Sequence, residues 1–222
     1  MKVAHYTHNL RAKLTWFFKS LLFLGIIYAS YLLILLSIPY LVLKPSIEFL
    51  RTKELIYHLD WWRISFYIHV FSSPIVILSG LFQFNRSILR SYKSIHRSLG
   101  FTYILFVILV SGPSGILLGL YANGGYIAQI SFVVLSSSWI LFTLIAYLKV
   151  RKHEYQSHSK WMMRSYALTL SAVTLRLYAY LFDLFNVPLG PTETYILIAY
   201  LSWIPNLIFA EICIKKDWFI DK

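Results

Sequence analysis

Residues 99–121 read LGFTYILFVILVSGPSGILLGLY, a stretch in which no side chain is charged. A helix that crosses the hydrocarbon core of a membrane needs about 20 mostly apolar residues. Strands of a membrane barrel instead alternate apolar and polar residues over segments of about ten. The stretch therefore predicts a transmembrane helix, and its Gly112-Pro113-Ser114-Gly115 sequence predicts a kink with close helix approach.

Apolar stretches of similar length occur on both sides of this one. Hydrophobic residues make up 58% of the 222-residue chain and charged residues 14%, against about 25% charged in ordinary domains. The predicted fold is therefore an all-α membrane bundle of six transmembrane helices, with tails at 1–15 and 215–222. The predicted spans are residues 16–43, 62–84, 99–121, 126–148, 161–185 and 194–214.

The net charge of +12 lies in short Lys and Arg clusters between the apolar stretches. This pattern predicts a lipid bilayer as the partner and argues against nucleic-acid binding, which uses a basic stripe on a soluble element. Positive residues are commoner on the cytoplasmic side of a membrane protein. If the N-terminus is cytoplasmic, sixteen Lys and Arg lie on that side, four lie outside, and Arg176 lies within a helix. Both ends of the chain are therefore predicted to be cytoplasmic.

Two ionisable residues are predicted at similar depth in the outer half of the membrane. At 1.5 Å of rise per residue, His69 lies roughly 10 Å and Arg176 roughly 13 Å from the outer helix ends. His69 fits a haem or metal ligand, a proton relay, or a neutral imidazole bonded to a neighbouring helix. Arg176 fits a structural ion pair with Asp183, two turns further along the same face, or a contact with an acidic ligand or quinone carbonyl.

A second pair of ionisable residues lies at the predicted cytoplasmic helix starts. His96 and His158 are at similar depth, so they are candidate ligands for one haem iron, as in haem b, or for one metal ion. The alternative is that both are solvated loop histidines. No second histidine is found at the level of His69, which argues against a two-haem arrangement. Arg97 and Arg164 add positive charge at the same predicted level.

The last span carries Tyr200, Trp203 and Asn206, which share one helix face because they are spaced by three residues. Pro205 weakens the hydrogen-bond ladder beside them. A polar and aromatic face next to a proline fits a ligand-lined cavity. It fits packing against another helix equally well.

Several motifs resemble a bacterial family of membrane proteins termed domain of unknown function 2306. They are the HRxxGxxY run at 96–103, the GxxQF run at 80–84, His158 with the WMMRSYA run at 161–167, Leu175-Arg176-Leu177, and Tyr200-Leu201-Ser202-Trp203 with Asn206. The chain departs from the family pattern at Ser159, where the family usually has Arg. The resemblance implies a helical bundle in a bacterial cytoplasmic membrane and no particular reaction. It draws attention to His69, His96, His158, Arg164 and Arg176.

Three functional hypotheses remain open at this point. The first is a haem-associated or redox protein that uses His96 and His158. The second is a small transporter or ligand-binding protein that uses His69 and Arg176. The third is a non-catalytic assembly factor that binds another membrane protein. The sequence leaves open whether the chain is an enzyme.

Overall fold

The computed structural model describes residues 2–84 and 86–216, except for the side chains of residues 2–16, 86, 87 and 90. Within these residues there is no strand, and six helical segments are long and apolar enough to cross a membrane. The prediction of an all-α protein with six spans is therefore confirmed.

The elements are α1 (Lys2–Ser37), η1 (Ile38–Val42), η2 (Glu48–Lys53), α2 (Glu54–Tyr57), α3 (Asp60–Leu81), η3 (Phe82–Phe84), α4 (Arg86–Ser91), α5 (Lys93–Phe106), η4 (Val107–Ser111), α6 (Gly112–Leu120), α7 (Gly125–Arg151), α8 (Tyr155–Thr169), α9 (Ser171–Leu184), α10 (Pro191–Leu201) and α11 (Ile204–Lys215).

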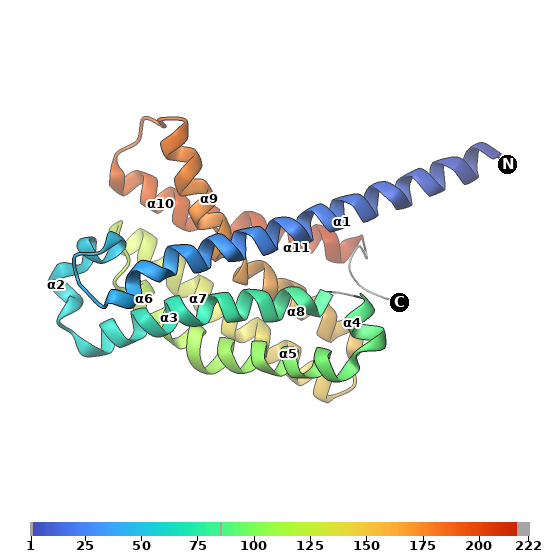
Figure 1. The fold of residues 1–222 in the computed structure, drawn as a ribbon, viewed down its shortest axis with the longest axis horizontal. Coiled ribbons are helices and arrows are strands. Elements are labelled where there is room, and N and C mark those ends of the chain that lie inside the picture. The colour runs from blue at the N-terminus through green and yellow to red at the C-terminus, as the bar shows by residue number, and fades with distance from the viewer. Residues whose placement is uncertain (1, 85, 217–222) are drawn as a thin grey trace.

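Both ends of the described chain lie at the same end of the bundle. Figure 1 shows α1 beginning and α11 ending at the end that also carries α4. We call this the basic end, and we call the end that carries α2 the opposite end. The helix of α1 starts at Lys2, so the predicted tail is helical up to the first candidate span, which begins at Phe17. Of the predicted tail 215–222, the last six residues lie outside the described part.

Three of the predicted spans are interrupted, two of them next to a proline at which the sequence predicts a disturbed helix. The third span passes through the π-helical segment η4 directly before Gly112 and Pro113. Proline has no N–H for the helix ladder, so a local change of winding there has a clear cause. The fifth span breaks at Leu170, between α8 and α9, and the sixth breaks at Ser202 and Trp203, between α10 and α11.

The two breaks in the fifth and sixth spans are joined to each other. The Thr174 hydroxyl donates to the Ser202 carbonyl at 2.5 Å. The Asn206 amide donates to Thr174 Oγ1 at 3.0 Å and to the Ala167 carbonyl at 3.3 Å. Backbone groups freed by a helix break inside a membrane need such partners, because lipid supplies none. The sequence signal for the sixth break is Pro205, which sits in the first turn of α11.

The packed core lies between α3, α5, α7 and α8. Its largest buried side chains include Tyr103, Trp139, Met162 and Tyr166. A Cβ atom at Gly80 would lie 2.6 Å from the Tyr166 ring, so only glycine permits this close approach of α3. By contrast, α1 presents many large apolar side chains outward, as expected for a peripheral helix covered by lipid.

The connection between the first two spans packs onto the opposite end of the bundle. Leu50 and Trp62 are fully buried there, so both are core residues. Lys53 is also buried and donates to the Tyr121 carbonyl and to Asn123 Oδ1, holding the connection to the turn after α6. Burial lowers the pKa of Lys53 from 10.5 to about 8.

Candidate functional sites

His69 lies against the π-helical segment of the third span. Its Nδ1 atom is 3.0 Å from the Ser111 carbonyl and 3.3 Å from Ser114 Oγ. A carbonyl oxygen only accepts hydrogen bonds, so Nδ1 carries the hydrogen and the other ring nitrogen, Nε2, holds the free lone pair. Ser72 of α3 bonds to the Ser111 hydroxyl at 2.6 Å, which holds α3 against the same segment.

Arg176 lies on α9 and acts electrostatically on His69 and on Tyr40 at the end of the first span. The shared depth that the sequence predicts for the two residues stays a prediction. The Arg176 side chain is exposed, and its guanidinium donates to the Ala172 carbonyl of its own helix at 2.8 Å. The proposed ion pair with Asp183 is absent, although both residues are described. The two residues are two turns apart, and Arg176 instead bonds one turn back toward the start of α9.

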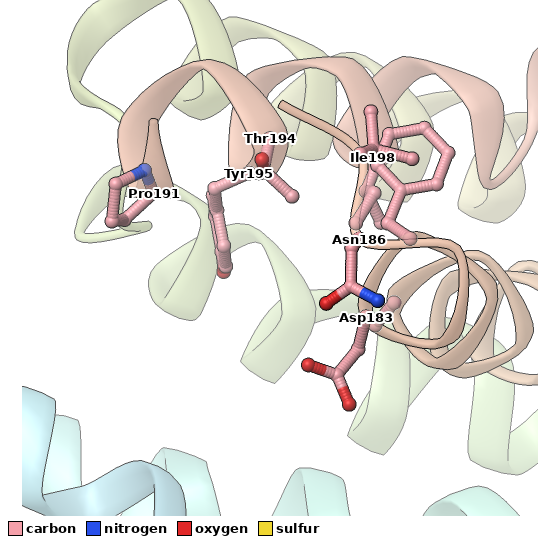
Figure 2. A pocket seen from close by; sticks show the side chains of 9 residues that line it. Asp183, Asn186, Pro191, Thr194, Tyr195 and Ile198 are labelled. Atoms are coloured by element: carbon pink, nitrogen blue, oxygen red, sulfur yellow. The ribbon is translucent and has the colours of Figure 1, made fainter. Parts of the chain in front are cut away.

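A pocket of about 490 Å³ lies between α9 and α10 near the opposite end. Asp183 and Asn186 come from the end of the fifth span, and Thr194 and Tyr195 come from α10 (Figure 2). Its lining residues Ala179 and Asp183 lie three and seven positions beyond Arg176, hence on the same face of α9. The pocket therefore begins about one turn from Arg176. Its volume is within the usual range for small-molecule sites.

The polar groups of the last span hold helices together. Tyr200 donates to the Ile127 carbonyl at 3.0 Å, and Trp203 Nε1 donates to Ser131 Oγ at 3.0 Å. Asn206 bonds across the helix breaks, as described above. All three groups are engaged by neighbouring spans, as the packing alternative predicts, and none of them lines the pocket.

His96 lies in the first turn of α5 and His158 in the first turn of α8. Seven residues beyond each of them, Tyr103 and Ser165 share a 2.6 Å hydrogen bond, so these faces of α5 and α8 are turned together. The two histidines interact electrostatically. Nδ1 of His158 donates to the Ala146 carbonyl at 2.8 Å, while Nδ1 of His96 is buried without a partner. Among the described residues, no group of three or more His, Cys, Asp or Glu is placed to hold a metal ion.

The two arginines predicted at this level differ in their surroundings. Arg164 forms a two-point ion pair with Glu211 of α11, at 2.5 and 3.0 Å, and its guanidinium stacks on Trp161. Arg97 is exposed. Arg164 therefore connects the fifth and sixth spans, and the Glu211 partner was not anticipated.

A buried network of hydroxyl groups in the core was also not anticipated. Tyr103 bonds to Ser165 and to Thr169, at 2.6 and 2.7 Å, and Trp139 Nε1 donates to Thr169 at 2.9 Å. Thr143 bonds to Ser165 at 2.7 Å. The sequence feature that could have indicated this network is the set of Ser and Thr residues inside apolar spans, because their hydroxyls need partners away from water. Two members, Tyr103 and Ser165, lie in the resemblance motifs and have a packing role.

A family model described as a predicted membrane protein, DUF2306, matches residues 66–214. The chain belongs to the DUF2306 family. The DUF2306 match begins inside α3, so His69, His96, His158 and Arg176 lie within it, whereas Tyr40 and Lys53 lie outside. No curated protein and no solved structure matches the chain. Membership therefore supports a membrane protein and identifies no ligand or reaction.

Proposed function

We propose that this membrane protein binds a small anion in the layer formed by Arg176 and His69, as a ligand-binding or transport protein. One observation carries the proposal: the Arg176 guanidinium lies within a membrane span, is exposed, and has no acidic partner among the described residues. An unpaired guanidinium at membrane depth is costly. A carboxylate or phosphate group would offset that cost by accepting two parallel hydrogen bonds.

The surroundings of Arg176 support this proposal. The pocket between α9 and α10 begins about one turn further along α9 from Arg176, which is not among its lining residues. The interrupted fifth and sixth spans resemble a recurring feature of transporters, in which binding sites lie where helices are discontinuous near mid-membrane. On the charge count, we further propose a bacterial cytoplasmic membrane with both chain ends in the cytoplasm.

The test is binding of benzoate and of inorganic phosphate to the detergent-purified protein by calorimetry. Arg176→Gln should weaken binding of the recognised anion by about 10- to 100-fold, because a hydrogen bond to a charged group contributes about 1.5–3 kcal/mol. Arg63→Gln is the matched control, since Arg63 is an exposed guanidinium paired with Asp60 outside the layer. The two probes distinguish a carboxylate site from a phosphate site. Binding of neither anion, or equal binding by wild type and Arg176→Gln, would overturn the proposal.

Haem b bound by His96 and His158 is the second candidate. The buried Nδ1 atom of His96 has no partner, and His158 donates Nδ1–H to a carbonyl, as iron-ligating histidines commonly do. Two imidazoles suffice for haem, because the porphyrin supplies the other four ligands. Bound haem would supply electron transfer, and these two residues would hold its iron.

The haem candidate is tested by an absorbance spectrum of protein purified from haem-replete cells, before and after dithionite. A Soret band should be present in the wild type and in His153→Ala, whose imidazole bonds to Tyr155 in the neighbouring turn. The band should be lost in the His96→Ala, His158→Ala double variant. Colourless wild-type protein would exclude this candidate and leave the anion proposal untouched.

A further inference from the structure

The pocket between α9 and α10 is lined by polar side chains that the protein itself leaves unpaired. Asp183, Asn186 and Tyr195 line it, and within the described part of the chain none of their side chains has a hydrogen-bond or ion-pair partner. Further along the sixth span, by contrast, Tyr200 and Asn206 are bonded to neighbouring helices. Polar groups that stay free around one pocket, while their neighbours are paired, are available to a ligand.

Asp183 gives the pocket a negative charge. It lies one residue before the end of the fifth candidate span. Every charged residue from 177 to 214 is acidic, and the nearest cation along the chain, Arg176, bonds back to the Ala172 carbonyl and does not line the pocket. A carboxylate without a counter-charge in a membrane span is costly, so a cationic ligand would stabilise it.

The rest of the lining favours an organic cation over a metal ion. In Figure 2, Tyr195 of α10 lies across the space from Asp183 and Asn186. Phe182 and Ile198 add apolar surface, and aromatic faces attract an ammonium group. A calcium or magnesium site needs several oxygen ligands, whereas no group of three or more His, Cys, Asp or Glu in the described ranges is placed to hold a metal. A volume of about 490 Å³ accommodates a small organic molecule.

We infer that this pocket binds a protonated primary amine with an apolar body. The ammonium group donates to the Asp183 carboxylate and to the Asn186 amide oxygen, and the apolar body lies against Phe182 and Tyr195. The site is separate from the anion site proposed at Arg176. The inference therefore goes beyond the proposed function, because it adds a second class of ligand and stands without the first.

Calorimetry with phenethylammonium on the detergent-purified protein tests the inference. Asp183→Asn keeps the size of the side chain but removes its charge, and it should weaken binding by about 10- to 100-fold, because a hydrogen bond between charged groups is lost. Glu193→Gln is the matched control, since Glu193 is an exposed carboxylate in the first turn of α10 that does not line the pocket. This control should bind phenethylammonium as the wild type does.

A neutral ligand gives a second test on the wild type alone. The alcohol 2-phenylethanol has nearly the shape of phenethylammonium without its charge, and it should bind at least about tenfold more weakly. Absence of phenethylammonium binding, equal binding by Asp183→Asn, or equal binding of the alcohol would each overturn the inference. If Asp183→Asn does not fold, the comparison with the alcohol decides. Binding of benzoate or phosphate is measured separately, so the anion site and the amine site can fail independently.

Discussion

The two halves of the fifth span, α8 and α9, differ sharply in how they pack. The first half, α8, has buried residues at almost every position of its last two turns, namely Met162, Met163, Ser165, Tyr166, Ala167, Leu168 and Thr169. The second half, α9, has no buried residue. Figure 1 shows α9 leaving the bundle beyond the break that follows α8, whereas α10 returns to pack against α7, to which Tyr200 donates a hydrogen bond.

This difference distinguishes a tightly packed half of the span from a loosely packed half that carries the candidate binding residues. The α8 half is fixed by ring contacts and by a saturated hydroxyl network. The α9 half holds Arg176 and the pocket, and its contacts with the bundle are few. Segments that bind ligands or move are commonly the least stable parts of a structure. The four predictions below test this contrast.

The largest effect is expected from overpacking α8 through Gly80→Ala. The added Cβ would lie 2.6 Å from the Tyr166 ring and 2.8 Å from the Tyr103 ring, so the free energy of unfolding should fall by about 3 kcal/mol. Gly25→Ala in the first span is the control, because nothing lies within 4 Å of its Cβ position. The midpoint of unfolding by SDS measures both. Equal midpoints would show that the α8 half is not tightly packed.

A smaller loss is expected from Tyr103→Phe. The change removes the hydroxyl shared by Ser165 and Thr169 and leaves a buried network incomplete, at a cost of about 1–2 kcal/mol. Tyr180→Phe on α9 removes a hydroxyl from an exposed side chain and should leave the same unfolding midpoint unchanged. Similar losses of stability in the two variants would show that α8 and α9 do not differ in packing.

Arg164→Lys should cost less, about 0.5–1 kcal/mol. Lysine keeps the charge but loses the two-point contact with Glu211 and the stacking on Trp161. The pair is partly exposed, with 40% exposure of the Glu211 side chain, and this limits its contribution. Glu211→Gln combined with Arg164→Lys gives the coupling energy in a double-mutant cycle. A coupling energy of zero would show that the pair does not hold α8 to α11.

The remaining prediction concerns Lys53 at the opposite end and depends on pH. Because burial lowers its pKa to about 8 from 10.5, the folded chain holds fewer protons than the unfolded chain between these values. The contribution of Lys53 to stability should therefore rise with pH from about 8 to 10.5. The difference in unfolding midpoint between wild type and Lys53→Met measures it. A difference that stays constant across this range would contradict the assigned burial.

The candidate sites show which features could be predicted from the sequence and which could not. A depth for His69 and Arg176 could be predicted by counting residues within spans. Their partners could not be predicted, because the Ser111 carbonyl and the Ala172 carbonyl are backbone groups that any residue type supplies. Glu211 was visible in the sequence as a charge in the last span, but its distance from Arg164 depends on how α8 and α11 pack.

The sequence by itself determined the six membrane spans, because the free energy of placing side chains in lipid depends mainly on local hydrophobicity over about 20 residues. It also determined the break at Pro205, since a missing N–H is a local property. Only the tertiary structure decided that the fifth span breaks at Leu170, which carries no local signal, and that this break meets the one in the sixth span. Helix packing likewise decided that, among the described residues, Arg176 is left without an acidic partner while Arg164 gains one, because ion pairing depends on distances between residues that are far apart in the chain.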